Sequence, residues 1–389
     1  MLWLRLLPWE YGIRNLFRRP LRSCLTLAGL TTVIFLVLLV VGFIRGLERS
    51  LDLSGDPQVI LVYGLGMGEN LEYSSIPNRM GDLVPASLNC IRNFYDESYV
   101  SPELYLGTQI SVEGRDEPSM GLVRGVKPGV LLVRRQVEIA QGHWPQPGEI
   151  MVGRVAATKL GVTRSDLSIG KTLMLEGRSW RISGVFSACG AVFESEVWCR
   201  LDDLQQAMKR QDLSLVALTL APGANASEVE LFCMDRTDLQ LQATSEVAYY
   251  DAIQEDYGPI RWLAWLVVLL VSGAGLFAGL NTMYGAALGR IRELSTLQTI
   301  GFARRAIVLS LVQEGVILAA AGCLIASVLA ITLVNGAAVR FTMGAFVLWI
   351  DSVAVLVGCG AGLLLGLVGS IPPAIQALRM PVVDGLKSV

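Results

Sequence analysis

The sequence of 389 residues lacks most features on which a soluble enzyme depends. It has one histidine, His143, which excludes a metal site built from several histidines and any catalytic arrangement that needs a second one. It has no Gly-x-x-x-x-Gly-Lys-Ser/Thr motif, so the chain carries no P-loop ATPase of its own. Only 17% of the residues are charged, and a net charge of -2 gives no basic footprint for a nucleic acid.

The seven cysteines are scattered and include no Cys-x-x-Cys pair. Three lie in or beside apolar runs, where a cysteine is usually a small buried hydrophobe. The other four would face an oxidising compartment and could pair, and a Cys189–Cys199 bridge across a hairpin is one possibility. The first group is Cys24, Cys323 and Cys359, and the second is Cys90, Cys189, Cys199 and Cys233.

Hydrophobic residues make up 52% of the chain and are concentrated in four runs. A helix of about 20 apolar residues spans roughly 30 Å, the thickness of the hydrocarbon core of a membrane. Because backbone polar groups in lipid must bond one another, the runs predict four transmembrane helices. The first run could also be a signal peptide, but its length and the absence of a small-residue cleavage pattern favour an uncleaved anchor. The runs cover residues 25–44, 262–288, 307–339 and 353–371.

Arginines are distributed unevenly around these runs. Five precede the first run and four lie between the second and the third, whereas the connection between the third and the fourth holds only Arg340. Basic residues collect on the cytoplasmic side, so both termini and the loop at residues 289–305 are predicted there. The long polar insert between the first and second runs is then predicted to lie on the outer side.

The expected fold is therefore membrane α-helical, with one helix before and three helices after a large α/β extracytoplasmic domain. The N-terminal part combines aromatic residues with arginines, which is typical of an interfacial helix. The expected division is an interfacial or cytoplasmic amphipathic helix at 1–23, transmembrane helix 1 at 24–46, the extracytoplasmic domain at 47–259, transmembrane helix 2 at 260–288, a cytoplasmic coupling loop at 289–305, transmembrane helix 3 at 306–339, transmembrane helix 4 at 345–375 and a cytoplasmic tail at 376–389.

The outer domain has mixed α/β patterning. Glu194 and Glu196 in this domain have no acid partner placed by the sequence, so we expect them to be solvated or to pack between lobes rather than to catalyse. The predicted elements are strands at 57–63 and 105–112, a hairpin over 173–186 that turns at Glu176-Gly177, and helices over 76–94, 201–208 and 245–257.

The loop after the second apolar run holds the main functional candidate. Ile291, Leu294, Leu297 and Ile300 recur every three residues and predict a short amphipathic helix with one apolar stripe. Gly301 is suited to end that helix. The stripe needs a groove, on a partner protein or at the bilayer surface. The charged residues around it are Arg290, Arg292, Glu293, Arg304 and Arg305.

Two observations concern polar and small residues inside the apolar runs. A charge in a membrane helix is by default functional, but Glu314 could instead lie at the headgroup edge and pair with Arg304 or Arg305. Asn281 could bond across helices, and Gly275-x-x-x-Gly279 is a weak dimer motif.

The loop also carries a family resemblance. The segment Arg292-Glu293-Leu294 through Leu297 to Ile300-Gly301, followed by Arg304-Arg305, resembles the cytoplasmic loop of MacB/FtsX-type (type VII) ABC transporter permeases. Residues 13–26 and 373–386 resemble the family's entry into the first helix and exit from the last. The chain departs from the family pattern, which usually has Gly, Arg, Ala and Ala, at Ser295, Gln298, Thr299 and Phe302.

The insert resembles the MacB-like periplasmic core domain of the same family. The similar stretches are Pro-Gly-Glu-Ile-Met-Val-Gly at 147–153, Ile-Ser-Gly-Val-Phe at 182–186 and Phe-Glu-Ser-Glu-Val-Trp at 193–198. The resemblance implies two lobes, of which one is a porter-like α/β lobe. The other is an inserted β-rich lobe near residues 127–200.

The resemblance implies the permease subunit of an ABC transporter of the MacB/LolCDE type in the bacterial inner membrane. The chain would not be an enzyme, because ATP and Mg would be bound by a separate ABC ATPase seated on the coupling helix. The permease would transmit the conformational change of that ATPase across the membrane to the periplasmic domain, which would export or extract a substrate. Further implied partners are a second permease copy, identical or a paralogue, a periplasmic membrane-fusion adaptor, an outer-membrane channel and membrane lipids.

Two alternatives stay open at this point. One is an FtsX-like mechanotransducer that regulates a cell-wall hydrolase, although that branch has a smaller outer domain. The other is a membrane-anchored binding or sensor protein without an ATPase.

Overall fold

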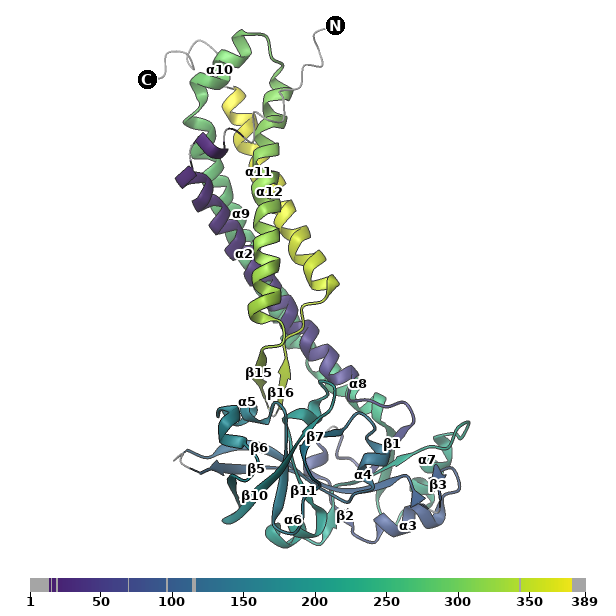
Figure 1. Ribbon diagram of the computed structural model, residues 1–389. Coiled ribbons are helices and arrows are strands. Elements are labelled where there is room, and N and C mark those ends of the chain that lie inside the picture. The colour runs from purple at the N-terminus through teal and green to yellow at the C-terminus, as the bar shows by residue number, and fades with distance from the viewer. Residues whose placement is uncertain are drawn as a thin grey trace. The chain divides into compact units, whose positions relative to one another are not determined.

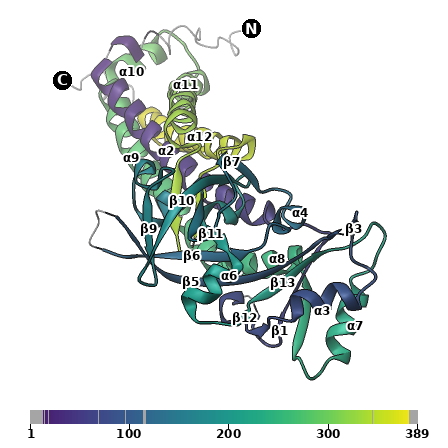
Figure 2. The ribbon, with the colours of Figure 1, turned by 60° about the horizontal axis from the view of Figure 1, so that its bottom comes forward.

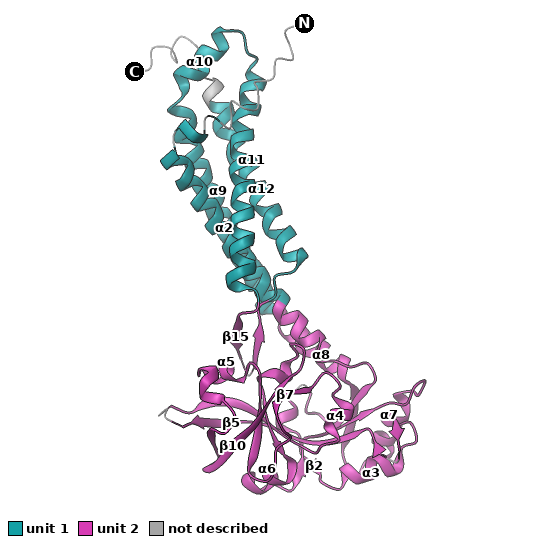
Figure 3. Cartoon of the chain, viewed as in Figure 1, with its two compact units in different colours: residues 1–45, 259–335, 349–389 teal, residues 46–258, 336–348 magenta. Residues whose placement is uncertain are grey.

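The computed structural model describes residues 14, 16–18, 20–68, 70–95, 97–113, 117–342 and 344–379. The chain forms two compact units (Figure 3). Unit 1 holds residues 1–45, 259–335 and 349–389, and unit 2 holds residues 46–258 and 336–348. The chain therefore passes between the units four times. Most of the expected interfacial helix at 1–23 and of the tail at 376–389 lies outside the described residues.

Unit 1 is built from long apolar helices, of which α9 and α11 are linked through the short α10 (Figure 1). Four helices of the described residues are long and apolar enough to cross a membrane, one before and three after the insert, as predicted. α2 has residues in both units, and α11 continues into a π-helical stretch at Ala330–Val334. The four long helices are α2 (Pro20–Asp52), α9 (Gly258–Leu288), α11 (Arg304–Leu329) and α12 (Ser352–Arg379), and the short α10 (Ile291–Thr299) lies between α9 and α11 in the sequence.

Glycines of α12 bring the helices of unit 1 close together. A Cβ atom added at Gly358 would lie 2.5 Å from Leu38 of α2, and one at Gly366 would lie 2.5 Å from Ala319 of α11. A Cβ at Gly362 would meet both Ile34 and Cys323, at 2.6 and 2.8 Å. The spacing of four residues places the three glycines along one face, which is the small-residue packing typical of membrane helices.

The connection between the third and fourth long helices differs from the prediction. Residues 335–342 and 344–351 are not helical; they contain the hairpin of β15 (Ala338–Phe341) and β16 (Gly344–Val347), and α12 begins only at Ser352. The backbone of Gly336 has a φ of +85°, which ends the preceding helix. The hairpin belongs to unit 2 and packs its apolar side chains there. The apolar side chains of the hairpin therefore pack within unit 2 and do not belong to a transmembrane helix.

Unit 2 contains a large mixed sheet (Figure 2). Its strand order is β14-β1-β13-β5-β6-β11-β8-β10-β7, and β9 pairs with β10 and β5. The strands are β1 (Val59–Gly64), β5 (Val100–Val112), β6 (Ser119–Val126), β7 (Glu138–Gly142), β8 (Glu149–Gly153), β9 (Thr172–Leu175), β10 (Arg178–Ser187), β11 (Val197–Arg200), β13 (Leu215–Thr219) and β14 (Leu241–Ser245). Short pairs are formed by β2 (Ile76–Pro77) with β12 (Asp212–Leu213) and by β3 (Asn93–Phe94) with β4 (Glu97–Ser98).

The two faces of this sheet differ because successive side chains of a strand point to opposite sides. Ile60, Leu104 and Val123 belong to one apolar core, together with side chains from helices α3, α6 and α7. Their neighbours Glu103 and Arg124 face the other side, which is polar and aromatic. The helices are α3 (Met80–Ser87), α4 (Val130–Val133), α5 (Ala156–Leu160), α6 (Leu201–Met208), α7 (Ser227–Asp235) and α8 (Glu246–Asp256), with 3-10 turns η1 (Leu71–Tyr73), η2 (Arg164–Leu167) and η3 (Val192–Ser195).

Most local predictions for unit 2 are confirmed. The hairpin over 173–186 turns at Glu176 and Gly177, whose φ angles of 49° and 72° suit a two-residue turn. Ser245 caps α8 by accepting a hydrogen bond from the Ala248 amide at 3.2 Å. The helix predicted over 76–94 is wrong in extent, because the chain turns extended at Leu88 and Ile91 bridges to Leu220.

The segment expected as an inserted lobe near 127–200 continues the same sheet. It supplies β7 to β11, and β11 pairs in parallel with β6. Residues from both sides of this junction share one apolar core. Within the described residues, both parts belong to one compact unit, and their division into two lobes stays a prediction.

Candidate functional site

The loop predicted to be functional forms a short helix at one end of unit 1 (Figure 1). α10 covers Ile291–Thr299 and is followed by Gly301, whose φ of +102° only glycine adopts without strain. The periodicity and the terminating glycine therefore predicted the local structure correctly.

The apolar stripe of α10 is buried largely by the chain itself. Leu294 is 4% exposed and packs with Ala287 at the end of α9 and Ile307 at the start of α11, and Leu297 packs against this cluster. The expectation that the whole stripe needs an external groove is therefore corrected. Ile300, at 69% exposure, is the member that remains uncovered.

The solvent-facing surface of α10 is mixed in character. Arg292, Glu293 and Ile300 are exposed on it, and Arg304 and Arg305 are exposed at the start of α11. Arg290, in contrast, is only 8% exposed. The nine residues predicted for this site thus divide into an inner group that holds the helix and an outer group that is open to contact.

A buried ion pair fixes the start of α10 to α11. The guanidinium of Arg290 donates from Nη1 to both carboxylate oxygens of Glu314, at 2.8 and 3.0 Å. Both side chains are less than 10% exposed. Glu314 therefore pairs with Arg290, not with Arg304 or Arg305 as one alternative had it. Two buried charges that face each other join the α9–α10 corner to the body of α11.

The residues proposed for helix packing behave differently from one another. A Cβ at Gly275 would lie 2.8 Å from Val33 of α2, so this glycine already serves a contact within the chain. A Cβ at Gly279 would meet nothing within 4 Å. Asn281 is exposed on α9 and forms no hydrogen bond to the residues that the structure describes.

A second cluster of charges lies on the polar face of the unit 2 sheet. Arg124 donates to Glu103 at 2.5 Å and to both oxygens of Glu196 at 2.7 Å. Arg134 bonds Glu103 at 3.3 Å and forms an ion pair with Glu246 of α8. All five side chains are at most 4% exposed, so the network is hidden from water.

Aromatic rings surround this network. The Arg124 guanidinium lies 4.2 Å from the centre of the Tyr105 ring, and that of Arg134 lies 4.7 Å from the Phe193 ring. Trp198 donates from Nε1 to Glu196 at 2.7 Å. Burial alone would raise the pKa of Glu103, but Coulomb attraction to Arg134 and Arg124 outweighs it and lowers the pKa. The carboxylate therefore stays ionised in the interior.

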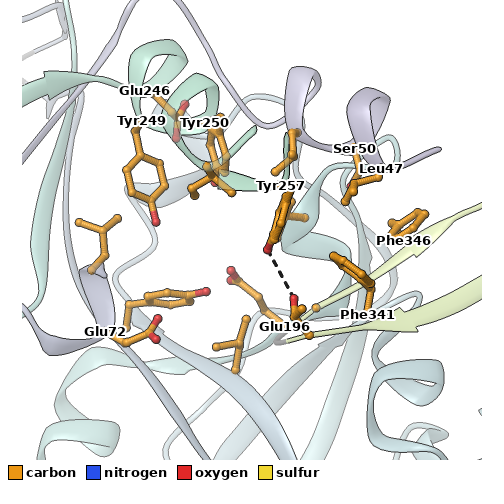
Figure 4. A pocket seen from close by; sticks show the side chains of 18 of the residues that line it. Leu47, Ser50, Glu72, Glu196, Glu246, Tyr249, Tyr250, Tyr257, Phe341 and Phe346 are labelled. Atoms are coloured by element: carbon orange, nitrogen blue, oxygen red, sulfur yellow. Dashed lines mark hydrogen bonds between the residues drawn. The ribbon is translucent and has the colours of Figure 1, made fainter. Parts of the chain in front are cut away.

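Beside the network is a cavity of about 280 Å³ (Figure 4). Its walls come from the end of α2, η1, β5, β6, α8 and the β15–β16 hairpin. The Tyr257 hydroxyl lies 3.4 Å from that of Thr342 in the hairpin turn, and the Tyr257 ring contacts Phe341 edge-on. The hairpin is thus part of the cavity wall.

The hairpin is also attached by a lysine. Lys159 of α5 is 1% exposed and donates to the Thr342 carbonyl at 2.9 Å. Burial, assisted by Arg340, lowers the pKa of Lys159 to about 8. A group that is largely uncharged at mildly alkaline pH therefore lies under the turn of the hairpin.

The sequence missed this second region. Glu196 was expected to be solvated or packed, and it is packed, as is Glu194, whose Oε1 accepts from the Ala188 amide at 2.8 Å. One signal was available for the rest: Glu103 and Arg124 are the sole charged residues of their strands, and an isolated buried charge requires a partner.

The remaining sequence candidates carry no chemistry of their own. All seven cysteines are free, so the Cys189–Cys199 bridge does not form, and burial raises the pKa of the Cys199 thiol. His143 is exposed directly after β7, with Nδ1 2.9 Å from the Trp144 carbonyl. No group of three or more His, Cys, Asp or Glu within the described residues could hold a metal ion.

Comparison with known proteins adds two sequence matches. The description "MacB-like periplasmic core domain" fits residues 23–230, which is more than half of the chain. The description "FtsX-like permease C-terminal" fits residues 262–382. The chain belongs to the MacB/FtsX-type ABC transporter permease family. Permeases of this family work with ABC ATPase partners.

Solved structures give more distant likenesses. The periplasmic region of MacB from Actinobacillus actinomycetemcomitans is 10% identical, with a TM-score of 0.40, and the match covers 52% of this chain and 94% of that one. The extracellular domain of the transporter YknZ from Gram-positive bacteria is 14% identical, with a TM-score of 0.36, over 48% and 99%. A domain of a permease protein from Porphyromonas gingivalis, described as putative, is 12% identical, with a TM-score of 0.35, over 49% and 90%. No curated protein matches this permease.

Proposed function

We propose that this permease transmits the motion of a separate ABC ATPase to its outer domain, unit 2, for export or extraction of a substrate. The ATPase would bind ATP and Mg, and the permease would catalyse no reaction. The carrying observation is the division of α10 into a fixed inner face and an open outer face. Transmission of motion needs both faces. The outer face must bind the ATPase, and the inner face must keep α10 from sliding against the other helices of unit 1.

The inner face supports this role in two ways. Leu294 is buried against the ends of α9 and α11, and the Arg290–Glu314 pair ties the preceding corner to α11. Displacing α10 therefore displaces α9 and α11 as well, since a packed interior does not deform continuously. The outer face, with Arg292, Glu293 and Ile300, is the proposed seat of the ATPase.

The four chain passages between the units support the proposal that motion of the helices is transmitted to unit 2. α2 and α9 carry the first two passages, and the β15–β16 hairpin returns the chain to unit 2 between α11 and α12. Movement of the helices thus has covalent routes into unit 2. We place unit 2 in the periplasm and the helices in the bacterial inner membrane, with a second permease copy, identical or a paralogue, completing the complex.

The export branch of the MacB/LolCDE type is favoured over a cell-division type by the size of unit 2, which exceeds two hundred residues. An adaptor of the membrane-fusion type and an outer-membrane channel are proposed partners for that branch. Co-purification with a cell-wall hydrolase instead would favour the FtsX-like alternative.

The test is retention of the ATPase. Ile300→Asp places a charge at the exposed apolar position of α10 without entering the inner cluster, and we expect loss of the co-purifying ATPase. Leu231→Asp changes a side chain of similar exposure, 58%, on α7 of unit 2 and should retain it. An Ile300→Asp complex that keeps its ATPase would refute the proposed seat, and a wild-type chain without any ATPase would favour the sensor alternative.

A further inference from the structure

We propose that unit 2 binds a small organic cation with an apolar group in the cavity beside the Arg124 network. The cavity of about 280 Å³ is near the lower limit of ligand pockets, which hold roughly 300–1,000 Å³. It suits a ligand of one ring or a short branched chain rather than a lipid. This site is separate from α10 and does not depend on the presence of an ATPase.

The lining is rich in aromatic rings. Faces and edges of such rings supply apolar contact, and their faces attract cations, as in the aromatic sites that bind quaternary ammonium groups. Burial raises the pKa of Tyr249 and Tyr250, so both phenols are neutral at physiological pH. The six aromatic residues of the lining are Tyr105, Tyr249, Tyr250, Tyr257, Phe341 and Phe346.

The fixed charges around the cavity add up to a negative balance. The buried network contains three carboxylates, of Glu103, Glu196 and Glu246, against the two guanidinium groups of Arg124 and Arg134. Two further acidic residues, Glu72 and Asp256, line the cavity, and no further basic residue among those the structure describes does. A cationic ligand would offset this excess, whereas an anion would increase it.

Glu72 provides the most direct argument. It is half-buried on η1 and forms no ion pair among the residues that the structure describes. Burial raises its pKa, because the carboxylate loses water without gaining a cation. Figure 4 shows Glu72 and Tyr249 on one side of the cavity and Phe341 and Phe346 on the other, with Glu196 between them. A cation in this space would have a carboxylate and aromatic rings on several sides.

The walls of the cavity come from separate segments of unit 2, so a bound ligand would hold these segments together. Tyr249 and Tyr250 belong to α8, Tyr105 belongs to the sheet, and Phe341 and Phe346 belong to the hairpin between α11 and α12. One ligand would therefore contact three segments that no disulfide joins. Its binding is expected to hold the hairpin against the sheet of unit 2.

The experiment measures binding of benzyltrimethylammonium to the full chain in nanodiscs by isothermal titration calorimetry. We expect saturable binding of one cation per chain, at least tenfold tighter than that of neopentylbenzene, its uncharged carbon analogue, and no binding of benzoate. Glu72→Gln keeps the shape of the side chain and should weaken cation binding about tenfold or more, as loss of a charge partner in a partly buried site does. Asp251→Asn removes an exposed carboxylate of α8 that does not line the cavity and should leave binding unchanged.

A second variant, Tyr257→Leu, removes one half-buried aromatic ring from the cavity wall. It should weaken binding of the cation more than binding of the neutral analogue. The proposal is overturned if wild type shows no saturable binding of the cation, if the neutral analogue or benzoate binds equally well, or if Glu72→Gln binds like wild type. A loss of ATPase retention in the Ile300→Asp variant does not affect any of these results.

Discussion

Replacing Glu314 by glutamine tests whether the Arg290–Glu314 pair holds α10 to its bundle. In wild type Arg290 Nη1 lies 2.8 and 3.0 Å from the two carboxylate oxygens, and both side chains are almost fully buried. Removing one partner of a buried ion pair costs about 3–5 kcal/mol, because the other charge stays buried and unpaired. The glutamine oxygen can still accept one hydrogen bond, so we expect a loss of about 2–3 kcal/mol in the free energy of unfolding.

The assay is unfolding of the purified chain in nanodiscs, followed by tryptophan fluorescence. The double variant Arg290→Met with Glu314→Leu removes both charges and should lie within about 1 kcal/mol of wild type, since an apolar pair of similar volume often replaces a buried ion pair without loss. Asp238→Asn removes the carboxylate of an exposed pair with Arg236 and should give no measurable change. Equal stability of Glu314→Gln and wild type would refute the reasoning, as would a double variant less stable than Glu314→Gln.

Two further predictions concern packing and pH. Gly362→Leu should lower the free energy of unfolding of unit 1 by about 3 kcal/mol, because the new side chain meets Ile34 and Cys323. Gly360→Leu places its side chain in open space and should be tolerated. Unfolding of both variants in nanodiscs checks this prediction. The pKa of Lys159 is lowered to about 8 from a usual value of 10.5, so this residue binds more protons in the unfolded chain between these values, and it should contribute to the free energy of unfolding a component that rises with pH from about 8 to 10.5. Lys159→Met should lack that part of the slope, and equal slopes in denaturant unfolding of the two proteins would contradict the assignment.

The local structure of α10 could be predicted because its signals are local. The recurrence from Ile291 to Ile300 and the position of Gly301 specify a short helix and its end. The partners of its stripe could not be predicted, since Ala287 and Ile307 come from two other helices. The same holds for Glu314: the sequence left open whether it lies inside the membrane segment or at the headgroup edge, and the choice of Arg290 among the nearby arginines depends on the geometry of the corner between α9 and α10.

The network of unit 2 illustrates a different limit. The alternation of strand side chains places Glu103 with Tyr105, and Arg124 with Leu122, on one face of the sheet. Arg134, however, reaches that face from the residue that follows α4, and Glu246 reaches it from the start of α8. Only the tertiary arrangement brings them together. The β15–β16 hairpin was missed because Phe341, Ala345 and Phe346 have the composition of a membrane helix, although they pack within a folded domain.

The most direct test of the account is the sidedness of its two ends. In a chain with the exposed Cys24 and Cys189 replaced by serine, single cysteines are introduced as Met234→Cys on α7 and Thr299→Cys on α10, both at exposed positions. A membrane-impermeant maleimide should label Met234→Cys in spheroplasts and Thr299→Cys only after lysis. Labelling of Thr299→Cys in intact spheroplasts, or protection of Met234→Cys until lysis, would contradict transmission from a cytoplasmic ATPase to an outer domain.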